Sequence, residues 1–362
     1  MAHQNFINWM KAFGMFLIVI GHIFGGSQQI FNLVSQPIYT KQLGVCFFIF
    51  IMGWSLANEH RPGTAVVFKR LFPVYFYGLL FTLLLSAFFF LIGHDINESN
   101  YLPFFLGVNV FFNNFPANPT TWYIGTYFHL LLFWLFFLQG KEIKGTHLLL
   151  AFVSEIVIRS FLIWSGKDFI AYMLLPNWLS VFLLGAYLHN KKDCQWRVKN
   201  VAIVMIWLVI VFWWVSSSNI ITFGKGFPFR SLVFNEFWEL PIRSFLVSML
   251  YIISTVVAFS LFRMLRHSKI INFFARNSLL TFIAHMPIIF GIHADFYRLF
   301  NSDFHGRLAL IIMIYVGLAV ISEYIQKKIP LANLSNRSWR KITQYLPVET
   351  DTHSRTTKHK DT

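Results

Sequence analysis

The sequence predicts an all-α protein, a polytopic transmembrane helical bundle of about ten helices with both termini in the cytoplasm. Three observations support this fold class. Of the 362 residues, 56% are hydrophobic and only 12% are charged, which is more apolar surface than a soluble domain of this size can bury. Apolar runs of membrane-spanning length recur along the chain, and Lys and Arg gather in the short segments between them.

Ten apolar runs are candidates for helices that cross the hydrocarbon core, which takes about 17 to 25 residues. They lie near 6–24, 43–58, 71–92, 122–138, 146–165, 169–189, 201–215, 241–262, 278–293 and 307–326. The second and seventh runs are short. Pro176 interrupts the sixth, because proline removes a helical hydrogen bond.

Loops rich in Lys and Arg alternate with loops that are poor in them. The basic segments contain Arg61, Lys69 and Arg70; Lys141 and Lys144; Lys191, Lys192, Arg197 and Lys199; and Arg263, Arg266, Lys269 and Arg276. Because cytoplasmic loops carry the excess of positive charge, this alternation predicts that both termini are inside. A composition shift after Lys327 divides the chain into a transmembrane domain, 1–326, and a basic, polar, flexible cytoplasmic tail, 327–362.

The formal charge of +15 does not indicate a nucleic-acid partner. A nucleic-acid-binding protein gathers its basic residues on one polar face, whereas here they separate apolar runs and act as topology signals. Cys46 and Cys194 have no disulfide or metal-ligand pattern. The sequence also lacks a metal-binding box, a phosphate-binding loop and a dinucleotide-binding glycine pattern. The partners that remain are the lipid bilayer and a substrate inside it.

Lys11 and His22 lie on the first predicted span, eleven residues apart. Eleven steps of about 100° return a helix to within about 20° of its starting face, so the two side chains share a face and lie about 16 Å apart along the axis. Lys11 is near the predicted cytoplasmic end and His22 near the outer end. A ligand stretched along this face can touch both. The structural alternative is that Lys11 extends to the interface and His22 bonds to a neighbouring helix.

Other polar side chains need a partner or a function, because a charge at the bilayer centre costs about 2.5 kcal/mol or more. Lys69 and Arg70 stand at the cytoplasmic start of the third span, with Pro73 in its first turn. They either hold phosphate groups or only set the topology. His285 lies in the middle of the ninth span, where Pro287 frees a backbone acceptor nearby, so it is either functional or a satisfied structural histidine.

Glu155 and Arg159, four residues apart in the fifth span, are expected to form an intrahelical ion pair. The pair either neutralises itself or forms the wall of a polar cavity. His129 in the fourth span receives no function.

Six segments carry a family resemblance. They are "NWMKAFGMFLIVIGH", "LGVCFFIFIMGWSLA", "FKRLFPVYF", "WYIGTYFHLLLFW", "NWLSVFLLGAYL" and "ARNSLLTFIAHMPII". In this order they resemble the acyltransferase 3 family of bacterial inner-membrane proteins over most of the chain. The resemblance assigns family positions to Lys11, His22, Arg70, Pro73, Ser278, His285 and Pro287.

Some positions depart from the family pattern. Lys11 replaces a more usual arginine, which loses the planar fork suited to phosphate or carboxylate. Asn8 stands where an acidic residue is common, Met52 where serine is usual, and Val67 where the first arginine of an Arg-x-x-Arg pair would lie. These departures concern donor binding rather than the class of protein.

The resemblance implies a multi-pass enzyme of the bacterial inner membrane, a membrane-embedded O-acyltransferase that needs no metal. It would transfer an acyl group, most often acetyl, from cytoplasmic acetyl-CoA or another acyl-CoA. The acceptor would be a hydroxyl of an envelope carbohydrate such as O-antigen, capsule or exopolysaccharide. Lys11, Lys69 and Arg70 would hold the phosphates of CoA through charge-assisted hydrogen bonds.

The catalytic residues implied by the resemblance are His22 and His285. His22 would act as a general base on the acceptor hydroxyl, or would form a transient acyl-imidazole. His285 would orient His22 or the acceptor, and Ser278 is expected to cap a helix.

Two other classes of protein fit parts of the pattern. A secondary transporter or a flippase for a lipid-linked sugar also has about ten helices with a few buried charges, and inverted sequence repeats would favour it. No such repeat is visible in the sequence. A polyprenyl-linked glycosyltransferase would carry acidic residues in outer loops, for which Glu236 and Glu239 are candidates.

Overall fold

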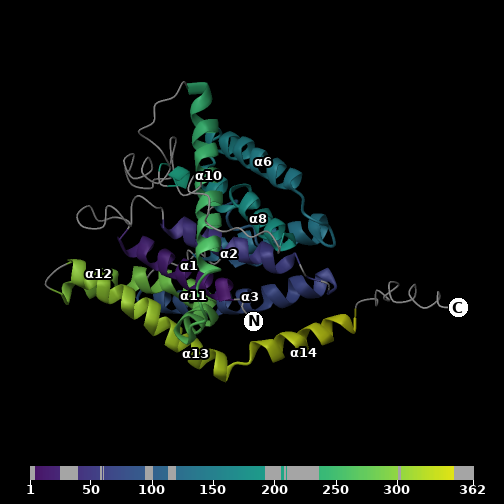
Figure 1. Cartoon of the computed structure of the whole chain (residues 1–362). Coiled ribbons are helices and arrows are strands. Elements are labelled where there is room, and N and C mark those ends of the chain that lie inside the picture. Colours follow the sequence, from purple (N-terminus) through teal and green to yellow (C-terminus); the bar gives the residue numbers. More distant parts are fainter. Residues whose placement is uncertain are drawn as a thin grey trace.

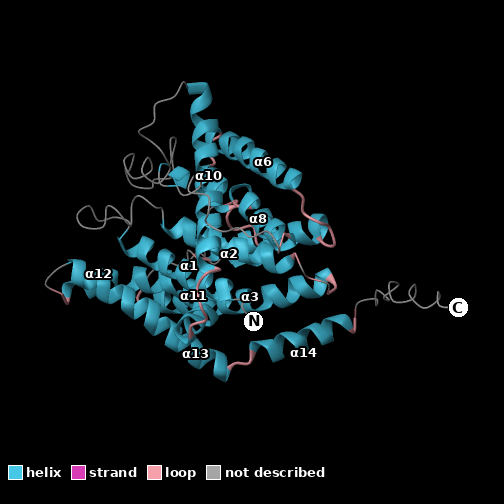
Figure 2. Ribbon diagram, in the orientation of Figure 1, coloured by secondary structure: helices cyan, strands magenta, loops and turns pink. Residues whose placement is uncertain are grey.

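The computed structural model describes residues 5–24, 40–57, 59, 61–93, 101–112, 120–191, 205–207, 209, 236–300 and 303–345. Every regular element in these ranges is a helix, which confirms the all-α class (Figure 2). The elements are α1 (Asn5–Phe24), α2 (Thr40–Leu56), α3 (Gly63–Leu91), α4 (Tyr101–Phe105), α5 (Thr121–Phe133), η3 (Trp134–Leu138), α6 (Gly145–Trp164), α7 (Asp168–Met173), η4 (Leu175–Asn177), α8 (Leu179–Asn190), α10 (Glu236–Phe262), α11 (Lys269–Arg298), α12 (Asp303–Ile312), η5 (Met313–Gly317), α13 (Leu318–Lys328) and α14 (Leu331–Thr343).

Six helical stretches of the described residues are long and apolar enough to cross a membrane. They are Asn5–Ile23, Gly63–Leu91, Thr121–Leu138, Gly145–Trp164, Phe237–Phe262 and Phe304–Lys328. Two shorter apolar helices, Lys41–Leu56 and Leu179–Asn190, accompany them. The predicted seventh span, 201–215, lies outside the described residues except at 205–207 and 209. The count of ten and the cytoplasmic termini therefore remain predictions.

Of two prolines singled out in the sequence, Pro176 interrupts its span as predicted, whereas Pro73 does not lie where it was predicted. α3 begins at Gly63, so Pro73 lies in the interior of a long helix, and its predicted place in the first turn is wrong. The amphipathic stretch before residue 71 continues the helix because its apolar residues Val66 and Val67 are buried. The sixth predicted span is broken as expected, with α7, η4 and α8 in succession and Pro176 inside η4.

The predicted polar tail begins with a helix. α14 follows α13 after a short turn and runs away from its end along the lower edge of the view (Figure 1). The ring of Trp339 on α14 packs against that of Phe68 on α3, with centroids 5.2 Å apart. Burial of one face of an otherwise polar helix is enough to order it.

Glycines allow α2 to pack closely against two neighbours, α1 and α8. A Cβ atom at Gly44 would lie 2.3 Å from the carbonyl oxygen of Gly14 on α1. A Cβ atom at Gly53 would lie 1.9 Å from the carbonyl oxygen of Phe182 on α8, and one at Gly185 would meet the backbone of α2 at 2.1 Å. Without a hydrophobic driving force between helices in lipid, such close backbone contact supplies much of the packing energy.

The predicted Glu155–Arg159 ion pair is confirmed, and it joins three helices. Arg159 Nη2 lies 3.6 Å from Glu155 Oε2 on α6, and both side chains are buried. The backbone and hydroxyl of Ser180 on α8 donate to the two carboxylate oxygens at 2.7 and 2.6 Å. On α10, Ser248 Oγ donates to Glu155 at 3.0 Å, and the Ser244 carbonyl accepts from Arg159 at 2.7 Å. The pair is a structural polar cluster that fastens α6, α8 and α10 together.

A proline determines how α5 docks on α11. Pro287 has no N–H, so the carbonyl of Ile283, four residues earlier in α11, lacks its helical donor. Thr120, which precedes α5, donates its hydroxyl to that carbonyl at 3.1 Å. The freed acceptor expected beside His285 is thus satisfied by another helix, and this bond places the start of α5 next to the histidine.

The first prediction tests the close contact of α2 with α8. Gly53→Ala should destabilise the protein by about 1 to 3 kcal/mol, because the added methyl group collides with the α8 backbone, which cannot move without shifting the helix. Gly145→Ala is the matched control, since no atom lies within 4 Å of the Cβ built there. Unfolding in mixed detergent micelles measures both. Equal stability of the two variants would contradict the packing described.

The second prediction tests the Thr120–Ile283 bond with a double-mutant cycle. Thr120→Val should cost about 1 to 3 kcal/mol, because it removes a hydrogen bond to a buried carbonyl. In a Pro287→Ala background the same substitution should cost less, since the alanine would supply the missing helical N–H. Additive losses, measured by the same unfolding assay, would show that Thr120 does not compensate for the proline.

Candidate active site

Two histidines from distant parts of the sequence meet between α1 and α11. His285 Nε2 lies 3.3 Å from His22 Nδ1, and the ring centroids are 5.0 Å apart with an angle of 55° between the planes. His285 is completely buried and His22 is partly buried. The structure thus brings together the two side chains that the sequence singled out as catalytic candidates.

The hydrogen bonds of the pair assign a tautomer to each ring. His22 Nδ1 lies 2.9 Å from the carbonyl oxygen of Ile18, and His285 Nδ1 lies 2.5 Å from that of Phe282. A carbonyl only accepts, so both Nδ1 atoms carry the proton. His285 Nε2 is then an acceptor that shares the Nδ1–H of His22. The remaining nitrogen, His22 Nε2, forms no hydrogen bond with a described residue, and in the neutral ring it carries the lone pair.

Two cations meet near the other end of α1. Arg70 on α3 is within electrostatic range of Lys11 on α1. The guanidinium of Arg70 donates to Ser55 Oγ on α2 at 3.1 Å, and it also hydrogen-bonds to the hydroxyl of Tyr127 on α5. No carboxylate of the described residues forms an ion pair with Lys11 or Arg70. Four helices therefore hold two nearby positive charges that form no ion pair with a carboxylate of the described residues.

The carboxylate of Glu59 lies within electrostatic range of Arg70 but is occupied by Arg61. Arg61 donates from Nε and Nη2 to the two oxygens of Glu59 at 2.7 and 2.6 Å. This bidentate bond in the loop between α2 and α3 lowers the pKa of Glu59 to about 2. Glu59 is therefore ionised and paired at neutral pH, and it leaves most of the charge of Arg70 uncompensated.

A row of aromatic rings lies between the cation pair and the histidine pair. From Tyr127, the bonding partner of Arg70, the row continues to Tyr123 at 6.1 Å and to Phe282 at 4.8 Å, measured between centroids. Phe282 in turn lies 5.6 Å from the ring of His285. Neither Tyr123 nor Tyr127 was predicted from the sequence as a site residue. Their spacing of four residues, which puts them on one face of a helix, was the available signal.

Lys69 and Ser278 are two other residues for which the sequence predicts a role. Lys69 is partly buried on α3, and no hydrogen bond or ion pair among the described residues joins it to Lys11 or Arg70. Ser278 donates to the carbonyl of Ala275 at 2.9 Å from the interior of α11, so its expected role as a helix cap is wrong. The helix begins nine residues earlier than the predicted span, and in this added part the ring of Phe274 stacks on that of Tyr315, with centroids 4.4 Å apart.

One lysine near the histidines was not singled out by the sequence. Lys41 is the second residue of α2, and it is partly buried within electrostatic range of His22. A basic residue at the start of an apolar run resembles a topology anchor. Only the packing of α2 against α1 brings it to the histidine pair.

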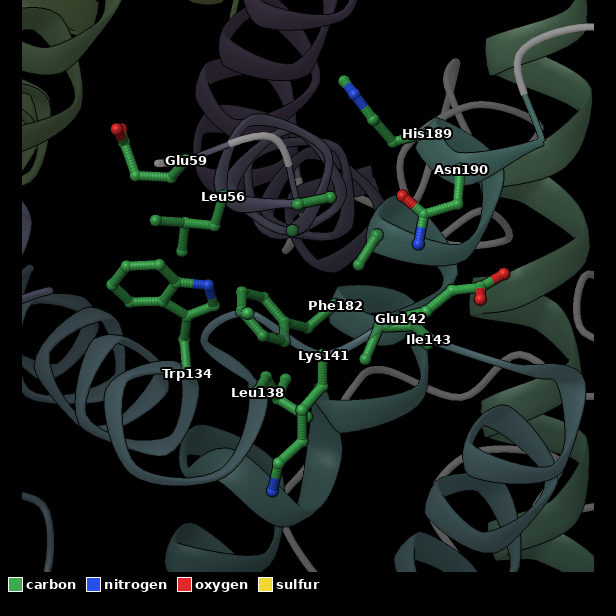
Figure 3. Close-up of a pocket in the computed structure, with 14 residues that line it drawn as sticks. Leu56, Glu59, Trp134, Leu138, Lys141, Glu142, Ile143, Phe182, His189 and Asn190 are labelled. Carbon is green, nitrogen blue, oxygen red and sulfur yellow. The ribbon is translucent and has the colours of Figure 1, made fainter. Parts of the chain in front are cut away.

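A cavity of about 530 Å³ lies elsewhere, at the end of α2 opposite Lys41 (Figure 3). Trp134 and Phe182 form its centre, and the charged ends of Lys141 and Glu59 point away from these rings. None of the predicted site residues lines it. Within the described residues, no group of three or more His, Cys, Asp or Glu is arranged to hold a metal ion.

Comparison with known proteins gives a family but no individual relative. A family model described as an acyltransferase domain matches residues 4–323, which includes both histidines and both cations. No curated protein matches the chain. No solved structure matches it either. Since the match covers nearly the whole chain, this protein belongs to the acyltransferase 3 family and is a multi-pass membrane acyltransferase.

Proposed function

We propose that this enzyme transfers an acyl group, in the simplest case acetyl, from cytoplasmic acyl-CoA to a hydroxyl of a carbohydrate of the bacterial envelope. The observation that supports this most is the arrangement along α1. The histidine pair lies near one end of the helix, and near the other lie two cations that form no ion pair with a described carboxylate. Lys11 and His22 share a helix face about 16 Å in length, which suits a long, thin donor with an anionic head and a reactive tail.

The cation pair suits the phosphate groups of CoA. Phosphates are recognised through charge-assisted hydrogen bonds, and arginine can offer two parallel donors. Arg70 is held at Ser55 and Tyr127, so its guanidinium is oriented before a ligand arrives. Lys11 supplies a second charge close to Arg70. Lys69 stands beside Arg70 in the sequence and is proposed to add to the local positive charge.

The histidine pair suits general base catalysis. His22 Nε2 would take the proton from the acceptor hydroxyl while the hydroxyl oxygen attacks the thioester carbonyl. When the tetrahedral intermediate collapses, the C–S bond breaks and His22 returns the proton to the CoA thiolate. His285 accepts from His22 Nδ1–H and so keeps the lone pair on Nε2. This direct transfer needs no acyl-imidazole, because the acceptor and donor meet at the same nitrogen.

The third prediction concerns His22. His22→Ala and His22→Gln should both lower acyl transfer by at least about a hundredfold, because an amide keeps a hydrogen bond but cannot carry the proton. The measurement is the transfer of label from [¹⁴C]acetyl-CoA into the envelope carbohydrate of membranes that contain the protein, at matched protein levels.

The matched control for His22 is His129→Gln, which changes another histidine within a spanning helix. His129 lies on α5 against Phe111 and not in the histidine pair. It should retain activity. If His22→Gln transfers label at the wild-type rate, His22 is only a structural partner of α11 and the proposed mechanism is wrong. If wild-type membranes transfer no label, acetyl transfer itself is wrong, and the transporter or flippase becomes the leading alternative.

The fourth prediction concerns Arg70. Arg70→Ala should weaken donor binding by about 1.5 to 3 kcal/mol, which corresponds to a rise of roughly 10- to 150-fold in the apparent KM for acetyl-CoA. Arg70→Lys should recover part of this loss, since it keeps the charge but not the fork. Arg340→Ala, an exposed arginine of α14, is the control. An unchanged KM for Arg70→Ala would leave Arg70 with a topological role alone.

A further inference from the structure

Lys41 occupies a defined position beside His22 because α1 and α2 pack antiparallel. Phe6, near the start of α1, contacts Trp54, near the end of α2, with ring centroids 5.0 Å apart. Further along α1, a Cβ atom at Gly44 would meet the side chain of Ile18 at 2.6 Å. His22 lies one helical turn after Ile18 on α1, and Lys41 lies about one turn before Gly44 on α2. Because the two helices are antiparallel, both steps lead toward the same end of the bundle.

The same position follows from the contact of α2 with α11. Phe48 lies 6.3 Å from Phe282, measured between centroids. Lys41 is seven residues before Phe48 and therefore on the same face of α2. Toward the same end of the bundle, His285 is one turn beyond Phe282 on α11. The face of α2 that carries Lys41 is thus turned toward the histidine pair.

The environment of Lys41 contains no compensating charge within the described residues. Its ammonium forms no ion pair there with Asp or Glu. Neither histidine beside it carries a negative charge, and His285 is neutral because its Nδ1–H donates to Phe282 while its Nε2 accepts from His22. Burying part of a lysine among apolar helices costs free energy unless an anion is present at some stage. The anion that forms next to His22 during acyl transfer is the oxyanion of the tetrahedral intermediate.

We propose that Lys41 is a catalytic residue whose ammonium group stabilises this oxyanion. The inference rests on the proposed acyl transfer and adds the charged partner of the reacting carbonyl. As the acceptor oxygen forms its bond to the thioester carbon, the carbonyl π electrons move to the carbonyl oxygen, which becomes O⁻ and binds the Lys41 ammonium. When the electrons return, the C–S bond breaks and the thiolate takes its proton from His22. Lys41 donates hydrogen bonds throughout and transfers no proton.

The test separates stabilisation of the intermediate from binding of the donor. Lys41→Met, which keeps the length of the side chain and removes the charge, should lower the maximal rate of label transfer from [¹⁴C]acetyl-CoA by about 100- to 1,000-fold. The apparent KM for acetyl-CoA should change less than about threefold, because the interaction forms only in the transition state. Lys167→Met, an exposed lysine before α7, is the matched control and should behave as wild type.

A chemical rescue distinguishes the loss of the Lys41 charge from misfolding of the variant. Lys41→Cys should be inactive, and alkylation of the new thiol with 2-bromoethylamine rebuilds an ammonium at nearly the length of lysine. Activity should rise at least tenfold on alkylation, while wild-type protein treated in the same way should gain nothing. A purely structural role would not be restored by a reagent applied to the folded protein.

Three results would overturn the inference. Lys41→Met could transfer label at more than half the wild-type rate, or its defect could lie in KM alone, which would make Lys41 a donor-binding residue. The alkylated Lys41→Cys protein could also remain inactive. All three presuppose active wild-type membranes, which distinguishes them from a failure of the proposed function, where wild-type protein transfers no label.

Discussion

Within a bilayer, each polar group of a helix bundle must find its partner inside the protein, because lipid offers neither hydrogen bonds nor counter-ions. This constraint organises the structure. Glu155 and Arg159 satisfy each other and three serines, so they fasten α6, α8 and α10. Thr120 satisfies the carbonyl that Pro287 leaves without a donor, so it docks α5 on α11. Both contacts join helices through paired polar groups, so we assign them a structural role.

The same constraint distinguishes the candidate site. Lys11, Arg70 and Lys41 carry positive charge in or beside apolar helices, and no carboxylate of the described residues neutralises them through an ion pair. A protein retains such charges at a cost, which a ligand or a transition state can repay. Phosphates at the Lys11 and Arg70 end and an oxyanion at the Lys41 end are the two anions that the proposed acyl transfer from CoA would supply. The pattern of unpaired charge thus matches the chemistry of the family.

Close packing makes this arrangement possible. The glycines of α2 let it touch the backbones of α1 and α8, and the contacts of Gly44 with Ile18 and of Trp54 with Phe6 fix how α2 lies along α1. This packing brings Lys41 within electrostatic range of His22. The histidine tautomers depend on equally local geometry, since each Nδ1 is held by a carbonyl of its own helix. A shift of one turn in either helix would separate the proton acceptor from its neighbouring cation.

The sequence by itself determined the all-helical class, the positions of most spans, the ion pair four residues apart on one helix, and the family. It could do so because periodicity, hydropathy and local spacing are properties of a continuous stretch of chain. It also identified His22 and His285 as separate candidates, through the cost of polar groups in lipid. Only the tertiary structure decided that these two rings touch, that Tyr127 and Ser55 orient Arg70, and that Lys41 lies beside His22. These contacts join residues as many as 263 positions apart in the sequence. They depend on the register and rotation of each helix, which are set by side chains from several helices packing together. The sequence pattern of a single helix therefore does not reveal them.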